Sequence, residues 1–256
     1  MNDVEISHES GALWLTLNRP DQFNALTGEM VMTLIRELRS ATSRDDVRVV
    51  VLTGTGGAFS AGADLGGENA QDNYDADSVD GANMLMRAII ELDKPVVCGL
   101  NGIAAGVGMS TALACDLVVA TESAALTLAF TKIGLMPDGG ATATVAASVG
   151  RAKAMRLALL SDLITAQEAY DAGLVSHVFA DADYSEQLGK LVGRLSRGAP
   201  LAFAATKKAV NAATLDGLDA AFQRERAGQS LLLRTEDVAE GMKAFVEKRR
   251  AEFKGA

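Results

Sequence analysis

Residues 101–140 read NGIAAGVGMSTALACDLVVATESAALTLAFTKIGLMPDGG, and the expected elements on both sides are arranged around this stretch. It begins with a glycine-rich turn, Gly102 to Gly108, that leads into an apolar segment, Met109 to Ala114, long enough for a helix. Glycines before a helix let backbone N–H groups approach a ligand closely, and the helix start adds partial positive charge. The stretch therefore predicts a cradle for an anion or a developing oxyanion. Asp138, near its end, is the nearby candidate for carrying a proton.

The length, charge and composition exclude several classes of protein. A chain of 256 residues can bury a substantial core. No apolar run approaches the roughly 18 residues of a membrane span, and the first residues show no apolar secretory signal. The net charge of −9 argues against nucleic acid and against an anionic membrane as partners. Cys98 and Cys115 lie in apolar contexts and are expected to be buried thiols of a cytoplasmic protein, and no clustered His/Cys spacing offers a metal site.

Strands alternate with helices up to about residue 180, which predicts an α/β core. Alternating apolar residues on both sides of Ser10–Gly11 predict a hairpin, and Thr27 suits the N-cap of a helix. Continuous apolar runs indicate buried strands, and apolar residues at helical spacing indicate helices. The strands are expected at 47–52, 96–100, 117–120, 125–128 and 174–179, and the later helices at 83–92, 109–114, 152–160, 166–171, 184–196, 201–213, 218–233 and 235–250.

Two segments interrupt this pattern. Gly66 to Asp80 is polar, acidic and glycine-containing, and it is expected to form a surface loop. Gly198-Ala199-Pro200 is the best hinge, and only helices are expected after it. We therefore divide the chain into a core of residues 1–197 and a C-terminal helical region of residues 198–256.

A series of short motifs resembles those of the crotonase superfamily, the enoyl-CoA hydratase/isomerase proteins. Each motif is weak alone, but together they keep their order and spacing over nearly the whole chain. They are Asn18-Arg19-Pro20, Asn24-Ala25-Leu26, Phe59 to Leu65, Lys94-Pro95, Asn101 to Gly106, Cys115-Asp116-Leu117, Ile133-Gly134-Leu135, Pro137 to Gly140, Ala172 to Val175 and Phe245 to Arg249.

The resemblance implies a fold, an assembly and a ligand. The fold is α/β, a crotonase (ClpP-like) spiral of ββα units, followed by C-terminal helices that join chains into a homotrimer or a dimer of trimers. The ligand is an acyl-CoA or enoyl-CoA thioester. Coenzyme A enters as part of the substrate, and the resemblance implies no other cofactor, no metal, and no nucleic acid or membrane partner.

The resemblance also implies which residues form the site. Backbone N–H groups of Ala61 and Val107 would form an oxyanion hole for the carbonyl oxygen of the thioester. Two preorganised donors supply about 3–4 kcal/mol each where an enolate forms in a dry site. The residues implied to contact the acyl-CoA are Ala63, Asp64, Leu65, Phe130, Phe245 and Lys248.

The chain departs from the hydratases of this superfamily at their two catalytic glutamates. By motif, these positions hold Ser110 and Phe130, neither of which transfers a proton at neutral pH. Water addition is therefore disfavoured, because an acid and a base each contribute roughly 10²–10⁴-fold. The segment from Ala129 to Gly140 is most similar to the branch of ring-1,2-epoxyphenylacetyl-CoA and Δ3,Δ2-enoyl-CoA isomerases.

In that branch a single carboxylate stands at the position of Asp138. One base suffices for isomerisation, because the proton removed next to the thioester is returned at the γ carbon of the dienolate. Desolvation beside Phe130 and Met136 is expected to make Asp138 a better base. We therefore predict an enoyl-CoA isomerase of fatty acid metabolism in which Asp138 is both acid and base.

Other interpretations stay open at this stage. Asp138 in Pro-Asp-Gly-Gly also suits a turn or the N-cap of the next helix, and Asp64 suits a structural cap. Ser110 resembles the nucleophile of a Gly-x-Ser-x-Gly elbow, but a triad with His177 is disfavoured because His177 lies on an expected strand. If Asp138 is only a turn residue, the chain is a non-catalytic acyl-CoA binding protein. A hydratase without the usual glutamate pair is the remaining alternative.

Overall fold

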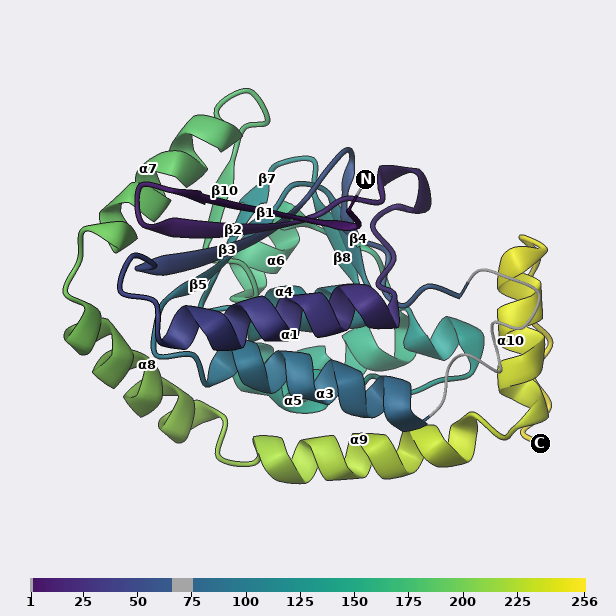
Figure 1. Cartoon of the computed structure of the whole chain (residues 1–256). Coiled ribbons are helices and arrows are strands. Elements are labelled where there is room, and N and C mark those ends of the chain that lie inside the picture. Colours follow the sequence, from purple (N-terminus) through teal and green to yellow (C-terminus); the bar gives the residue numbers. More distant parts are fainter. Residues whose placement is uncertain (1, 66–75) are drawn as a thin grey trace.

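The structure of the chain is a computed structural model that describes residues 2–65 and 76–256. Figure 1 shows a twisted sheet with helices on both of its faces. α1 and α3 lie side by side on one face, with α9 beyond them, whereas α7 lies on the other face. α8 runs round the outside between α7 and α9, and α10 stands at one end of the molecule next to the C-terminus.

The larger sheet has six strands in the order β1-β2-β3-β5-β7-β10. β1 and β2 form the predicted antiparallel hairpin around Ser10–Gly11, and every other pair in this sheet is parallel. Parallel strands that are covered on both faces read as continuous apolar runs, which is why their positions were predictable. The strands are β1 (Val4–Glu9), β2 (Ala12–Leu17), β3 (Val49–Gly54), β5 (Val96–Leu100), β7 (Leu117–Thr121) and β10 (His177–Phe179).

A smaller sheet of short strands follows the order β4-β6-β8-β9. β4, β6 and β8 are parallel, and β9 pairs with β8 in the antiparallel direction. The strands are β4 (Ala58–Ser60), β6 (Ile103–Ala105), β8 (Ala125–Thr127) and β9 (Ile164–Thr165). β6 was not predicted, because three residues between Gly102 and Gly106 are too few to show a period.

The helices agree with the predicted order. Thr27 caps α1 as predicted, since its Oγ1 accepts from the Met30 N–H at 3.2 Å. The α-helices are α1 (Gly28–Thr42), α3 (Ala76–Ile90), α4 (Val107–Ala114), α5 (Ala141–Leu160), α6 (Ala166–Ala172), α7 (Tyr184–Ser196), α8 (Pro200–Thr214), α9 (Leu218–Leu232) and α10 (Glu236–Val246). Two 3₁₀ turns are η1 (Pro20–Gln22) and η2 (Phe130–Ile133).

Two helices begin well before the residues that the sequence indicated. The loop predicted at 66–80 was wrong for residues 76–80, which belong to α3, and residues 66–75 lie outside the described part. Val79 is buried three residues before Ala82, so the apolar face of α3 extends back into the acidic segment. α5 begins at Ala141 rather than at residue 152, and Gly150 interrupts it with φ 73° and ψ 164°.

Apolar side chains fill a layer on each face of the larger sheet. The main cluster lies between the sheet and the helices that include α1, α3 and α4, and both free cysteines are buried as predicted. Burial raises the pKa of the Cys98 thiol. The second cluster is smaller and joins the sheet to α7 through Leu188 and Val192. The larger sheet is therefore packed on both faces, and the short strand β4 contacts its strands β3 and β5.

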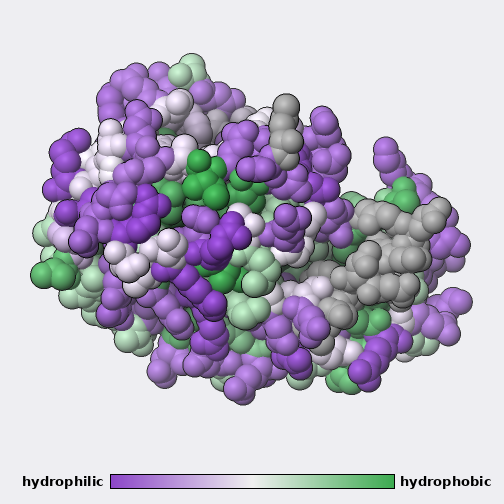
Figure 2. Space-filling model, viewed as in Figure 1, coloured by the Kyte–Doolittle hydropathy of each residue, from purple (hydrophilic) through white to green (hydrophobic). Residues whose placement is uncertain are grey.

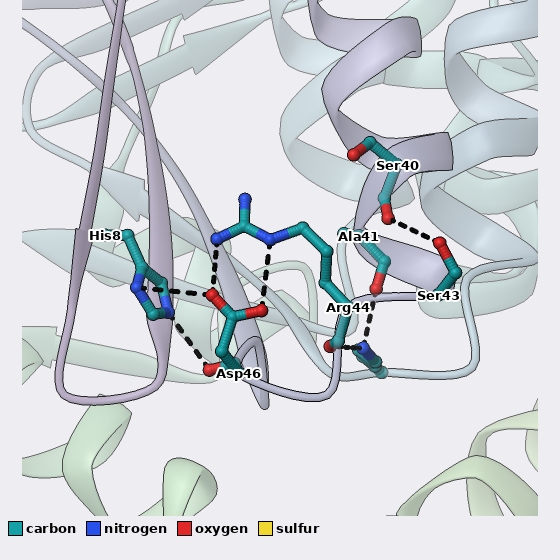
Figure 3. Close-up of polar contacts among 7 residues, drawn as sticks. His8, Ser40, Ala41, Ser43, Arg44 and Asp46 are labelled. Carbon is teal, nitrogen blue, oxygen red and sulfur yellow. Dashed lines mark hydrogen bonds and ion pairs between the residues drawn. The ribbon is translucent and has the colours of Figure 1, made fainter.

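The end of α1 is tied to the sheet by charged groups. The Lys94 ammonium lies 2.6 Å from the carbonyl oxygens of Ala41 and Arg44, where it caps the helix C-terminus. Figure 3 shows that Arg44 then pairs with Asp46, with Nη2 and Oδ2 2.7 Å apart, and that His8 of β1 lies against the same aspartate. Desolvation lowers the pKa of Lys94, and its two contacts with carbonyl oxygens give the side chain a structural role.

The surface is mainly hydrophilic on the face drawn in Figure 2, where hydrophobic groups gather near the middle. No helix in the described part of the chain is both long and apolar enough to cross a membrane. Beyond the hinge, residues 198–256 contain only the helices α8, α9 and α10 as regular elements. α8 has no buried residue. The role of this region in joining chains stays a prediction.

Candidate active site

Two neighbouring cavities open beside the start of α4, and they share Ala63, Asp64 and Val107. The larger has a volume of about 480 Å³ and the smaller about 330 Å³. Most of the lining is apolar, as expected for a pocket that holds an acyl chain or a flat ring system. The larger cavity is also lined by Leu26, Thr27, Gly28, Val31, Met32, Asp77, Ser78, Gly81, Ala82, Met84 and Leu85. The smaller is also lined by Gln22, Phe23, Ala25, Ala61, Gly62, Leu65, Gly106, Ala129, Phe130, Lys132, Ile133, Leu135, Phe245 and Val246.

The glycine-rich turn predicted as an anion cradle places the amide of Val107 between these cavities. Val107 is the first residue of α4, and its N-cap Gly106 has φ 52°, a conformation that favours glycine. No side chain caps this helix start, and the helical ladder begins with the Ser110 N–H bonding to the Gly106 carbonyl at 3.1 Å. Within the described residues, the Val107 N–H has no acceptor. It is therefore a backbone donor available to a ligand.

The structure changes the prediction for the second amide. The N–H of Ala61 already donates to the Phe23 carbonyl at 2.9 Å, so Ala61 is not available as an oxyanion donor. Leu26 instead bridges Ala63 as in a parallel ladder, with the bonds made by Leu26 N–H to Gly62 O (2.7 Å) and by Asp64 N–H to Leu26 O (3.0 Å). In such a bridge the N–H of the middle residue points away from the partner. The Ala63 N–H therefore points away from Leu26, and Ala63 lines both cavities.

Gly62 brings the two amides together. A Cβ built on Gly62 would lie 3.6 Å from the Val107 nitrogen and 2.9 Å from the Ala105 carbonyl oxygen. Only a glycine allows the backbone after β4 to approach the backbone before α4 so closely. The resemblance implied Ala63 as a CoA contact, and the structure makes its amide the better partner for Val107.

Asp138 is completely buried beside the first turn of α4. Its Oδ2 accepts a hydrogen bond of 2.7 Å from the Gln229 side chain of α9. The hydroxyl of Ser110, three residues after Val107, donates to the backbone carbonyl of Asp138 at 2.8 Å. Asp138 is among the described lining residues of neither cavity above, and it lies one helical turn behind the Val107 amide.

Asp138 does lie in a turn, since its backbone carbonyl accepts from the Ala141 N–H at 3.3 Å, but two other open interpretations are wrong. The N-cap of α5 is Gly140, with no side-chain cap bond, and the Asp138 carboxylate is directed to α9 instead. The hydroxyl of Ser110 donates to a backbone carbonyl, whereas His177 lies on β10 and stacks on Phe179 with ring centroids 5.9 Å apart. Ser110 and His177 therefore do not form a nucleophilic triad.

A second buried carboxyl group, Glu225 of α9, covers the start of α5. Its oxygens accept from the Gly140 N–H at 2.7 Å, from the Thr142 N–H at 2.9 Å and from the Thr142 hydroxyl at 2.5 Å. Burial raises the pKa of Glu225, and these hydrogen bonds offset part of that rise. Sequence reasoning missed Glu225 and Gln229. The signal was present, because both residues continue the helical spacing of the buried Leu218, Ala221 and Phe222.

The other predicted contacts divide into two groups. Leu65, Phe130 and Phe245 line the smaller cavity, as a role in binding requires. Asp64 lines both cavities, and its carboxylate pairs with the Arg19 guanidinium at 2.8 Å, which is a structural contact. Lys248 is exposed just after α10 and lies outside the described lining of both cavities, so the structure does not bring it to the site.

Comparisons with known proteins agree with this arrangement. Residues 7–256 match the family model for enoyl-CoA hydratase/isomerase. The chain belongs to this family. Over 100% of both chains, it is 36% identical to the 1,2-epoxyphenylacetyl-CoA isomerase and 38% identical to the 2,3-dehydroadipyl-CoA hydratase of Escherichia coli K12.

A solved structure, an enoyl-CoA hydratase from Mycobacterium avium subsp. paratuberculosis K-10, covers 99% of each chain with a TM-score of 0.93 at 44% identity. The predicted crotonase fold is thereby confirmed, and the protein is an enzyme of the enoyl-CoA hydratase/isomerase family that acts on CoA thioesters. The names of its relatives include both isomerases and hydratases. Within residues 2–65 and 76–256, no group of three or more His, Cys, Asp or Glu side chains is placed to hold a metal ion.

Proposed function

We propose that this member of the enoyl-CoA hydratase/isomerase family moves the double bond of an enoyl-CoA, or isomerises a ring epoxide of a CoA thioester. The observation that carries the proposal is the buried carboxylate of Asp138 beside α4, with Ser110 and Phe130 at the two positions where hydratases carry glutamates. The similarity to the 1,2-epoxyphenylacetyl-CoA isomerase supports it. The chain is 38% identical to a hydratase, so a direct assay is necessary.

The first step is the formation of an enolate. The thioester carbonyl oxygen accepts hydrogen bonds from the N–H groups of Ala63 and Val107, whose residues line both cavities. Negative charge grows on that oxygen when the α proton of a 3-enoyl-CoA leaves. Fixed backbone donors are worth about 3–4 kcal/mol each at that stage, because they need no reorientation. The N-terminus of α4 adds its partial positive charge.

The second step is the return of the proton. Asp138 takes the proton from the α carbon and delivers it to the γ carbon, so the double bond moves by one position and no atom is gained or lost. This role requires the acyl end to pass Val107 and extend along the first turn of α4 toward Ser110. Sequestration from water favours it, because water in contact with the site would protonate the dienolate and exchange the proton that Asp138 carries.

The test is an assay of purified protein with a 3-enoyl-CoA and with ring-1,2-epoxyphenylacetyl-CoA. We expect Asp138→Asn to lower turnover by about 10²–10⁴-fold, since the acid and base is lost while the volume stays the same. Asp116→Asn is the matched control. Asp116 is a partly buried aspartate that lies outside the candidate site, and its Oδ2 is 2.9 Å from the Lys207 ammonium. An undiminished rate for Asp138→Asn would overturn the assignment of roles.

The same assay separates the alternatives. Formation of 3-hydroxyacyl-CoA from a 2-enoyl-CoA, at a rate above that of isomerisation, would make the chain a hydratase. Tight binding of several acyl-CoAs with no turnover of any would make it a binding protein. We also propose that residues 198–256 join three chains, as the resemblance implies, and sedimentation of the purified protein measures this directly.

A further inference from the structure

α9 lies tightly against the segment that carries Asp138. A Cβ built on Gly140 would lie 2.9 Å from side-chain atoms of both Leu218 and Phe222, so α9 approaches this turn only because residue 140 is glycine. At the other end, a Cβ on Gly228 would lie 2.2 Å from the Met136 sulfur. The whole turn from 136 to 142 is therefore held between α4 and one face of α9.

Gln229 uses both ends of its side-chain amide on this turn. Its Nε2 donates to Asp138 Oδ2 at 2.7 Å, and its Oε1 accepts from the Met136 N–H at 3.3 Å. Both Gln229 and Asp138 have no exposed surface. The amide cannot be flipped without losing both bonds, so its NH₂ group is committed to the Asp138 carboxylate.

Glu225, one helical turn before Gln229, holds the same turn in a different way. It accepts from Gly140 and from Thr142, and none of its hydrogen bonds goes to the Asp138 carboxylate. α9 thus carries two buried polar side chains with different hydrogen-bond partners. One holds the backbone at the start of α5, and the other holds the carboxylate.

We propose that Gln229 is a positioning residue for Asp138: it fixes the direction of the carboxylate and determines how readily the carboxylate takes a proton. This inference rests on the proposed function. Because Oδ2 accepts from Gln229, the proton travels on Oδ1, and the carboxylate can deliver it to the γ carbon without rotating. A donor on Oδ2 also favours the charged form, the form that removes the first proton.

The charged groups that surround this pair are few among the described residues. Besides Asp138, the buried carboxyl group near this pair is that of Glu225 on α9. Arg226 of α9 forms an ion pair with Asp80 at 2.6 Å, and Arg87 of α3 forms one with Asp219 at 2.7 Å. Both ion pairs are at the surface, whereas Gln229 donates directly to the buried carboxylate.

The experiment measures kcat and KM of the full chain against pH, with a 3-enoyl-CoA as substrate. Gln229→Met keeps the length and removes the donor, and we expect kcat to fall about tenfold with little change in KM, as for one lost charge-assisted hydrogen bond. The acidic limb of the kcat profile moves to higher pH, because the carboxylate loses a bond that favoured its charged form. Gln229→Glu moves the limb in the same direction, since a second carboxyl group disfavours ionisation of the first.

Glu225→Gln is the matched control on the same helix. This variant weakens the hydrogen bonds to Gly140 and Thr142 and leaves the Gln229–Asp138 bond in place, so it measures the effect of a structural change alone on kcat. We expect the acidic limb of its kcat profile to stay at the wild-type pH. An unmoved limb in Gln229→Met, or an equal movement in Glu225→Gln, would overturn the positioning role. Asp138→Asn separates the two proposals: if that variant keeps its activity, the proposed function fails, whatever the Gln229 variants show.

Discussion

Helices α4 and α5 both have a glycine with positive φ as their N-cap residue. Neither helix start therefore has a capping hydrogen bond from its own N-cap side chain. At α5, the Glu225 carboxylate fills the place of the cap and accepts from two backbone N–H groups and one hydroxyl. At α4, Val107 lines two cavities and its N–H has no acceptor among the described residues. The same local geometry therefore serves stability in one helix and ligand binding in the other. What distinguishes them is whether the chain supplies its own oxygen.

The largest effect is expected at the open helix start. Val107→Pro removes the N–H, and proline is well tolerated at the first position of a helix, so the fold is retained. We expect turnover of the CoA thioester to fall by about 10²–10³-fold, the usual cost of one oxyanion donor. Val107→Ala keeps the N–H and should lose far less. If both variants lose activity equally, the side chain matters rather than the amide, and the comparison of the two helix starts fails.

The covered helix start gives the next effect, on stability. Glu225→Ala leaves the buried N–H of Gly140 and the partly buried N–H of Thr142 without their acceptor. We expect the free energy of unfolding in urea to fall by about 3 kcal/mol, because unsatisfied buried donors cost more than a net hydrogen bond. Glu236→Ala, at the exposed start of α10, is the control and should cost about 0.5 kcal/mol. Similar losses in the two variants would contradict a structural role for Glu225.

The smallest effect distinguishes two glutamates at helix starts by their pH dependence. Burial raises the pKa of Glu225 from 4.5, so its contribution to stability is full below pH 4.5 and is lost as pH rises through the folded value. Hydrogen bonds from Thr165 lower the pKa of Glu168 from 4.5, so its contribution is present above pH 4.5 and is lost as pH falls.

Urea unfolding from about pH 3.5 to 7.5 measures both slopes. Relative to Glu225→Gln, the wild type should lose stability as pH rises. Relative to Glu168→Gln, it should gain stability over the lower part of that range. Slopes of the same sign would show that hydrogen bonds, and not burial, dominate at Glu225.

Most of the fold was predictable because its main elements repeat a simple period. Buried strands such as Val96–Leu100 are continuous apolar runs, and α7 has an apolar stripe at helical spacing; both were predicted with the bounds that the structure shows. The start of α5 was missed, since threonines and small residues carry no clear helical period there and are weak helix formers. The start of α5 is stabilised by Glu225 of α9, which lies in a distant part of the chain and accepts hydrogen bonds from Gly140 and Thr142.

The site was predictable only in part, for a similar reason. A glycine-rich turn before a helix identifies Val107 from local sequence, because the N–H groups of a helix start need no partner to be exposed. Either Ala61 or Ala63 could donate its N–H to the thioester oxygen, and the amide that already binds a carbonyl of residues 23–26 is excluded. That carbonyl contact is tertiary, so the local sequence does not reveal it. Gln229, which donates to the Asp138 carboxylate, lies 91 residues later in the chain, beyond the range of any motif.

That separation has a consequence for biosynthesis. Ala63 lies in the β-bridge after β4 and Val107 begins α4, whereas Gln229 of α9 follows Val107 by more than a hundred residues. During synthesis, the side chain that orients Asp138 therefore leaves the ribosome after Ala63, Val107 and Asp138. A chain that ends before α9 lacks both this donor and the buried Leu218 and Phe222.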